Sequence, residues 1–321
     1  MPRMAVRVAI LDDYQGVALA SGPWERLGDA VEVTVFRDHV DGDDALVERL
    51  RPFEVVLAMR ERTPFGAARL ERLPSLRLLV TTGTGNAAID VAAATRLGIT
   101  VCGTRGLPSP TAELTWALIL ALVRHVPAED RALRGGGWQH TIGTELAGRT
   151  LGVIGLGRLG TRVAAIGRAF EMDVVAWSQN LSADAAANAR VRAVARDELL
   201  ATADVVTIHL RLSERTRALI GAAELAAKKP GAYLVNTSRG PIVDEAALLA
   251  ALRDGTIAGA GLDVYDTEPL PPDHPLRSAP NTVLTPHLGY VTTGTYEVFH
   301  GDAVDDIAAW LAGEPVRVLA P

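Results

Sequence analysis

The chain has 321 residues, of which 48% are hydrophobic and 22% charged, and its net charge is −6. This length allows two domains, each with its own core, and an acidic balance without a basic block argues against nucleic acid as a partner. The one cysteine, Cys102, excludes an intramolecular disulfide, and no stretch approaches the roughly 20 apolar residues of a membrane span. The first apolar run ends at Asp12 and is too short for a signal sequence, so we expect a cytoplasmic protein without membrane contact.

The first part of the chain alternates between short apolar runs and helical patterns. Such alternation is typical of a parallel sheet with helices on both faces. It predicts a first α/β domain, which contains no glycine-rich dinucleotide motif. We expect strands over 5–11, 31–36, 55–58, 76–81 and 99–102, and helices over 43–50 and 90–97.

A turn-rich stretch from Gly103 to Pro110 is a plausible hinge, and a long helix over 111–126 follows it. The alternation of strands and helices then resumes. We expect a first domain of residues 1–103 plus 291–321 and a second domain of residues 104–290. In this second part of the chain we expect strands over 151–154, 174–177 and 316–319, and strands contained in 203–210, 232–235, 258–264 and 282–284. We expect helices over 245–253 and 296–311.

The stretch from Thr150 to Trp177 has the order strand, glycine turn, helix, strand, which is the context of the dinucleotide fingerprint G-x-G-x-x-G. Gly155 permits the sharp turn, Gly157 lets the backbone approach a pyrophosphate, and Gly160 lets the helix pack on the sheet. The N–H groups at the start of that helix have no partners within the helix and point at an anion. The stretch therefore predicts a dinucleotide-binding Rossmann domain, with Arg158 and Leu159 beside the phosphates.

The second strand of such a domain should end in an acidic residue that binds the adenosine ribose. Here the strand is followed by Ser178, Gln179 and Asn180, with neither a carboxylate nor an arginine for a 2′-phosphate. All three side chains can hydrogen-bond a hydroxyl, and none repels a phosphate. The cofactor is therefore NAD or NADP, with NAD favoured.

Three later strands are each followed by a loop with a reactive side chain. AYLVNTSRG contains Arg239, GLDVYDTEP contains Asp263 and Glu268, and TVLTPHLGY contains His287. Ligands of open α/β sheets lie at the carboxyl ends of the strands, so all three loops should border the cofactor. An arginine can bind a carboxylate and polarise a carbonyl, a histidine can donate a proton, and a glutamate can stabilise the charged imidazole.

Each of these side chains also has an ordinary interpretation. An arginine can lie on the surface, a glutamate before proline is usually in a solvated turn, and a histidine after Thr-Pro is often a cap or part of the core. His209 and His274 compete with His287 as the proton donor, and spacing alone does not decide between them.

Four motifs together resemble the D-isomer-specific 2-hydroxyacid dehydrogenases over nearly the whole chain. They are GLGRLG at 155–160, NTSRGPIVDEAAL at 236–248, GAGLDVYDTEPL at 259–270 and TPHLG at 285–289. The resemblance implies two Rossmann-like domains with parallel sheets, a flavodoxin-like substrate domain, and cofactor and substrate in the cleft between the domains. It also implies a homodimer formed through the helix and arm around 111–140, and no metal.

The resemblance further implies roles for single residues. Arg239, Glu268 and His287 would be catalytic, and Asp263 would hold the nicotinamide carboxamide. The substrate carboxylate would rest on backbone amides of the glycine loop at 82–86. Arg60, Gly83, Thr84 and Gly85 are then the expected substrate contacts, and the expected cofactor contacts are Gly155, Gly157, Arg158, Leu159, Gly160, Ser178, Gln179, His209, Thr237 and Asp263.

We therefore expect an enzyme that transfers a hydride between nicotinamide and C2 of a small 2-keto or (R)-2-hydroxy acid. The alternative is an NAD(H)-sensing binding protein, similar to transcriptional corepressors of the same fold. The arginine, glutamate and histidine do not discriminate between the two hypotheses, but the sequence shows no peptide-docking feature. The sequence names neither the acid nor the physiological direction.

Overall fold

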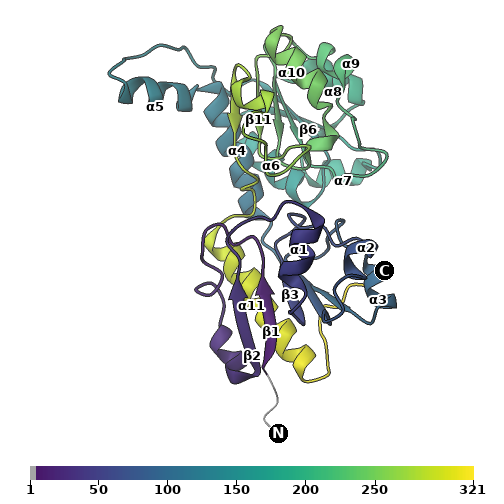
Figure 1. Cartoon of the computed structure of the whole chain (residues 1–321). Helices are drawn as coiled ribbons and strands as arrows, with labels where there is room; N and C mark the ends of the chain where they lie inside the picture. The colour runs from purple at the N-terminus through teal and green to yellow at the C-terminus, as the bar shows by residue number, and fades with distance from the viewer. Residues whose placement is uncertain (1–4) are drawn as a thin grey trace. The chain divides into compact units, whose positions relative to one another are not determined.

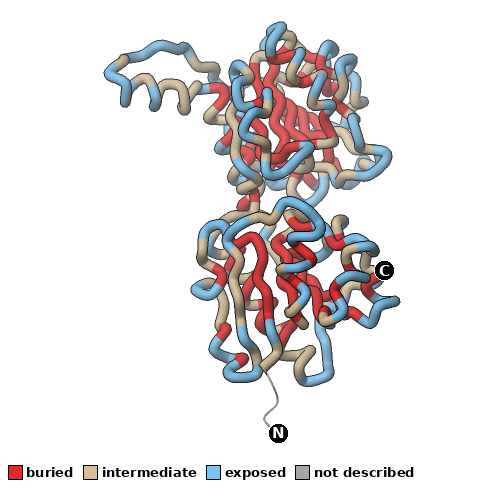
Figure 2. Tube along the Cα trace, in the orientation of Figure 1, coloured by how far each residue is buried: buried red, intermediate tan, exposed pale blue. Residues whose placement is uncertain are grey.

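The computed structural model describes residues 5–321, which divide into two compact units (Figure 1). Unit 1 extends to Leu107 and resumes at Thr292, and unit 2 runs from Pro108 to Val291. Each unit contains one parallel sheet with helices between the strands, which confirms the predicted fold class. Figure 2 shows that the buried residues of each unit gather on its own sheet.

The sheet of unit 1 has the strand order β2-β1-β3-β4-β5, which is the flavodoxin-like order. Its central strands β3 and β4 are buried along their whole length because helices cover both faces. The strands are β1 (Val6–Ile10), β2 (Val31–Val35), β3 (Val55–Ala58), β4 (Leu78–Thr81) and β5 (Thr100–Gly103).

Two hydrophobic clusters lie on the two faces of this sheet. One face is covered by α1 (Asp43–Leu50), α2 (Ala67–Leu70) and α3 (Val91–Arg96), and the other by η1 (Trp24–Ala30) and α11 (Thr293–Leu311). Helix α11 begins earlier than predicted because Thr292 caps it. The predicted strand over 316–319 is wrong, since this segment forms only one isolated bridge, between Val318 and Cys102.

The sheet of unit 2 has the order β12-β11-β10-β9-β6-β7-β8. Counted from β6, this is the Rossmann order with one further strand at the β12 edge. The strands are β6 (Thr150–Ile154), β7 (Asp173–Trp177), β8 (Arg192–Ala193), β9 (Val205–Ile208), β10 (Tyr233–Asn236), β11 (Gly259–Leu262) and β12 (Thr282–Leu284).

Helices cover both faces of this sheet as well. The cluster on one face includes α4 (Ser109–Val123) and α6 (Arg158–Ala169), and that on the other includes α8 (Arg196–Thr202), α9 (Ala222–Ala226) and α10 (Glu245–Arg253). The short elements α7 (Ala183–Asn188), η2 (Gly240–Ile242) and η3 (Pro275–Ser278) complete the unit. No helix within residues 5–321 combines the length and the apolar character needed to cross a bilayer.

The long helix predicted over 111–126 is interrupted. Helix α4 ends at Val123, His125 takes a left-handed conformation with φ of 52°, and a separate helix α5 (Val126–Arg134) follows. Residues 126–143, which we call the arm, project from the body of unit 2 (Figure 1). Helix α5 has no buried residue, and the arm exposes Val126, Leu133, Trp138 and Ile142.

The core of unit 1 offers a direct test of this packing. Leu79, in the middle of β4, is fully buried, whereas Leu97, just after α3, is 45% exposed. We expect Leu79→Ala to lower the free energy of unfolding by about 2–5 kcal/mol, because it removes buried methyl groups and leaves a cavity. Leu97→Ala is the matched control and should change that free energy by about 0.5 kcal/mol or less. Equal losses in the two variants, measured by denaturant titration with circular dichroism, would contradict this packing.

Candidate active site

Three adjacent strands of unit 2 deliver the reactive side chains. β10, β11 and β12 are neighbours in a parallel sheet, so their carboxyl ends lie along one edge. Arg239 follows β10, Glu268 follows β11 and His287 follows β12. This edge is where an open α/β sheet binds its ligands.

The structure joins His287 to Glu268. The imidazole Nδ1 lies 2.6 Å from Glu268 Oε2, and the backbone N–H of Tyr265 donates to the other carboxylate oxygen at 2.9 Å. His287 takes a left-handed backbone conformation with φ of 54°. A carboxylate on Nδ1 favours the tautomer with hydrogen on that nitrogen and leaves Nε2 for proton exchange.

Asp263 fixes the loop that carries His287 through three hydrogen bonds. Its buried carboxylate accepts hydrogen bonds from the Thr285 hydroxyl at 2.6 Å, from the N–H of Leu288 at 2.7 Å and from the N–H of Gly289 at 2.8 Å. Burial raises the pKa of Asp263, and these hydrogen bonds oppose that rise. The three donors lie on both sides of His287, so the aspartate fixes the loop that carries it.

Tyr265, which the sequence analysis missed, connects all three loops. Its hydroxyl donates to the carbonyl of Thr285 at 2.9 Å, and its backbone N–H binds Glu268. Gly240, next to Arg239, packs against the same residue, since a Cβ on Gly240 would lie 2.1 Å from the Tyr265 carbonyl carbon. A buried tyrosine inside a recognised motif gives no periodic signal, and only the packing reveals its role.

The loop of Arg239 is held by its own neighbours. Asn236 receives a hydrogen bond from the N–H of Ser238 at 3.0 Å and donates to the carbonyl of Arg239 at 2.9 Å. The Ser238 hydroxyl donates to the carbonyl of Leu210, after β9. Thr237, an expected cofactor contact, is buried with its hydroxyl 2.8 Å from that of Thr115 on α4.

The glycine turn after β6 fits a dinucleotide. Gly155 has φ of 98°, and a Cβ there would lie 2.7 Å from the carbonyl oxygen of His209. A Cβ on Gly160 would lie 2.1 Å from the carbonyl oxygen of Gly155, so the helix start packs directly on the turn. A Cβ on Gly157 would meet open space, which is the room that a pyrophosphate requires. Arg158 and Leu159 form the first turn of α6.

The structure separates the three candidate histidines. Burial lowers the pKa of His209 to about 4, so this side chain is neutral near pH 7 and a poor proton donor. Its Nε2 lies 3.0 Å from the Thr207 hydroxyl. His274 pairs with Glu245 at 3.0 Å and caps η3. His287 alone among the three follows the β12 strand end beside Glu268.

The expected substrate residues of unit 1 also come together, at the carboxyl ends of β3 and β4. Arg60 packs over the glycine loop, donating from its N–H to the Thr82 hydroxyl at 2.9 Å and from its guanidinium to the Thr82 carbonyl at 3.0 Å. The N–H of Gly83 donates to the Thr104 hydroxyl at 2.8 Å. Within residues 5–321 the N–H groups of Thr84 and Gly85 have no hydrogen-bond acceptor.

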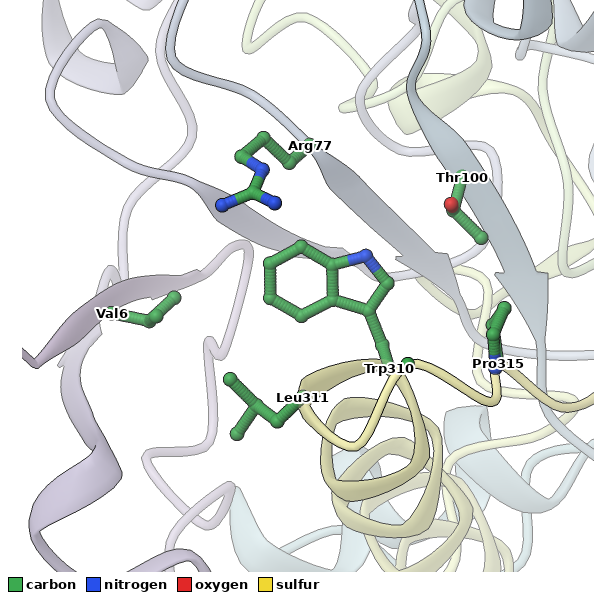
Figure 3. Close-up of a pocket in the computed structure, with 7 residues that line it drawn as sticks. Val6, Arg77, Thr100, Trp310, Leu311 and Pro315 are labelled. Atoms are coloured by element: carbon green, nitrogen blue, oxygen red, sulfur yellow. The ribbon is translucent and has the colours of Figure 1, made fainter.

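A hollow of about 270 Å³ in unit 1 is not part of this arrangement (Figure 3). It lies beside Val6 and Thr100, at the amino ends of β1 and β5, opposite the edge that carries Arg60. The Arg77 guanidinium lies over the Trp310 ring there, 5.0 Å from its centroid. Among the described residues, no cluster of three or more histidine, cysteine, aspartate or glutamate side chains could hold a metal ion.

Comparison with known proteins shows which family the chain belongs to. Residues 116–289 match the model of the D-isomer specific 2-hydroxyacid dehydrogenase NAD-binding domain. The chain is 42% identical over 255 residues to the glyoxylate reductase of Aeropyrum pernix, covering 76% of each protein. It is 38% identical over 277 residues to the D-3-phosphoglycerate dehydrogenase of Archaeoglobus fulgidus, of which it spans only 52%.

A solved structure gives the same result for the fold. The crystal structure of a phosphoglycerate oxidoreductase from Vibrio cholerae superposes with a TM-score of 0.91 at 39% identity, over 96% of this chain and 99% of that one. The resemblance inferred from the four motifs is thereby confirmed, as is NAD binding by the Rossmann unit. The chain belongs to the D-isomer-specific 2-hydroxyacid dehydrogenase family and is an oxidoreductase that acts on CH–OH donors with a nicotinamide dinucleotide.

Proposed function

We propose that this chain reduces a small 2-keto acid to the (R)-2-hydroxy acid, or catalyses the reverse reaction, with Arg239, Glu268 and His287 as its catalytic residues. The observation that carries the proposal is the 2.6 Å contact between His287 Nδ1 and Glu268 Oε2 at the carboxyl edge of the Rossmann sheet. The relatives named above are oxidoreductases, which favours this function over the nucleotide-sensing alternative.

When bound, the dinucleotide would supply or accept the hydride, and this chain's own residues would transfer the proton and stabilise the charge on the substrate. In the direction of reduction, His287 donates a proton from Nε2 to the carbonyl oxygen of the substrate. Glu268 stabilises the imidazolium through Nδ1 and keeps the ring oriented. Arg239 binds the substrate and polarises its carbonyl with a fork of donors.

The substrate carboxylate requires donors that are not already used. We assign it to the N–H groups of Thr84 and Gly85, and to guanidinium N–H groups of Arg60 besides the one that donates to Thr82. Gly83 contributes the turn itself, since its φ is 90° and its own N–H is bound to Thr104. Unit 1 would then be the substrate domain and unit 2 the dinucleotide domain. We further propose that both ligands bind in the cleft between the two domains.

The cofactor contacts follow the sequence of strand ends in unit 2. We assign the pyrophosphate to the turn from Gly155 to Gly160 and the adenosine ribose to Ser178 and Gln179, with His209 and Thr237 bordering the same edge. Asp263 has one acceptor position left on Oδ2 after its three hydrogen bonds, which suits the expected contact with a carboxamide N–H.

We also propose that the chain forms a homodimer through α4 and the arm. The apolar side chains exposed on the arm would be buried in this interface. Monomeric soluble proteins rarely expose contiguous apolar patches, which favours a partner for the arm. We also propose a cytoplasmic location, because a chain with one cysteine has no intramolecular disulfide of the kind found in oxidising compartments.

The proton-donor assignment is tested by substitution of His287. We expect His287→Ala to lower kcat for NADH-dependent or NADPH-dependent reduction of glyoxylate, hydroxypyruvate or pyruvate by about 100-fold or more, because the general acid is lost. Dinucleotide affinity should be retained. Glu268→Gln should lower kcat less, because the imidazolium loses its stabilising carboxylate but keeps a hydrogen-bond acceptor at Nδ1.

His274→Ala is the matched control, because it removes a histidine that is also paired with a glutamate in unit 2. Its kcat should stay within about twofold of the native value. Activity of His287→Ala within tenfold of native would refute the assignment, as would equal losses in the two variants.

The dimer is tested by mass in solution. Ile142 is 94% exposed and Trp138 is 75% exposed, so placing charges there should not disturb the fold of a monomer. We expect light scattering to give twice the chain mass for the native protein and the chain mass for the double variant Trp138→Asp with Ile142→Asp. Leu19→Asp, at a 54% exposed position of unit 1, is the control and should stay dimeric. A monomeric native protein would remove the proposal.

A further inference from the structure

The adenosine end of the dinucleotide site has an unusual composition in this chain. In Rossmann domains the ribose hydroxyls of the adenosine lie at the end of the second strand, where an acidic side chain binds them in NAD sites. That strand is β7, and Ser178, Gln179 and Asn180 follow it. With no carboxylate at these positions, the strand end does not repel a phosphate on the 2′-hydroxyl.

Ser178 is oriented towards the glycine turn. Its Oγ accepts a hydrogen bond from the N–H of Leu156 at 2.9 Å. A serine hydroxyl has one donor besides its acceptor positions, so Ser178 can still donate to an oxygen next to the turn. A phosphate oxygen can accept this hydrogen bond.

The loop after β9 brings an arginine to the same strand end. Thr216 fixes this loop, because its Oγ1 accepts from the N–H of Ser213 at 2.8 Å and donates to the carbonyl of Arg211 at 2.7 Å. Arg215 lies in the turn so formed and borders a small hollow of about 20 Å³ together with Gln179. The hollow is lined by Trp177, Gln179, Leu210, Arg215, Thr216 and Leu219.

The charges at this edge are predominantly positive. The glycine turn at 155–160, the strand end at 177–182 and the loop at 209–219 together contain four arginines and one carboxylate, Glu214. Arg217 acts on Asp266, whose pKa it lowers against the raising effect of burial. Within the part of the chain that the structure describes, Arg215 has no ion-pair partner, and its side chain is exposed.

We propose that Arg215, together with Ser178, selects the dinucleotide with a 2′-phosphate, so that this chain binds NADP(H) in preference to NAD(H). This inference rests on the dinucleotide-dependent function proposed above. A 2′-phosphate carries a charge of about −1.5 to −2 at pH 7, and a guanidinium offers it two parallel N–H donors. Arg215 supplies from a second loop the positive charge that the strand end itself lacks.

The test is direct binding, measured by calorimetry or by quenching of tryptophan fluorescence at fixed ionic strength. We expect the native protein to bind NADPH about tenfold more tightly than NADH or better, and 2′,5′-ADP more tightly than 5′-AMP. Arg215→Gln should weaken NADPH binding about 10- to 100-fold, the range for a lost hydrogen bond to a charged group, and change NADH binding by about twofold or less. Added salt should reduce the native preference.

Two further variants sharpen the result. Arg217→Gln, in the same loop but facing Asp266, is the matched control and should leave both affinities unchanged. Ser178→Asp should reverse the preference, because a carboxylate repels the 2′-phosphate and accepts hydrogen bonds from ribose hydroxyls. Tighter binding of NADH than of NADPH by the native protein would overturn the proposal, as would an equal loss of both dinucleotides in Arg215→Gln.

The same experiments distinguish this inference from the proposed function. If the native protein binds NADPH with the expected preference but reduces no 2-keto acid, the proposed reaction fails while the role of Arg215 stands. If it reduces a 2-keto acid with NADH and shows no preference for NADPH, the proposed reaction stands and the role of Arg215 fails.

Discussion

The buried carboxylate of Asp263 is the interaction on which the arrangement of the active-site loops depends. A carboxylate removed from water is costly unless it is hydrogen-bonded, and here Thr285, Leu288 and Gly289 each donate to it. These donors span the loop on both sides of His287. The aspartate therefore converts a flexible connection after β12 into a fixed platform, on which a left-handed backbone conformation aims the imidazole at Glu268.

Around this platform the other loops are joined by hydrogen bonds of Tyr265 and by close packing of Gly240. Tyr265 binds the histidine loop through its hydroxyl and Glu268 through its backbone N–H. Gly240 places the loop of Arg239 against the backbone of Tyr265, at a distance that no side chain would allow. His287, Glu268 and Arg239 thus follow adjacent strands of one sheet, which is the kind of preorganisation that the proposed acid–base catalysis requires.

The expected dinucleotide contacts at the same edge of the sheet are of two kinds, backbone contacts and side-chain contacts. The glycine turn provides contacts that any dinucleotide can use, because backbone N–H groups and close approach do not depend on the 2′ position. Discrimination has to come from side chains at the rim, and there this chain places Ser178 and Arg215. The proposed chemistry and the proposed cofactor choice are therefore carried by separate groups of residues.

The sequence by itself determined the alternating α/β architecture, the glycine turn and the placing of Arg239, Glu268 and His287 on loops after strands, because these depend on local periodicity and on short motifs. It did not decide among His209, His274 and His287, since burial of the first and the partner of the second depend on residues distant in the chain. In the sequence motif, the expected place for an arginine that binds a 2′-phosphate is the end of the second strand, and this chain has none there. Only the tertiary structure placed Arg215 and Tyr265, because a parallel sheet brings together loops that the chain order keeps apart.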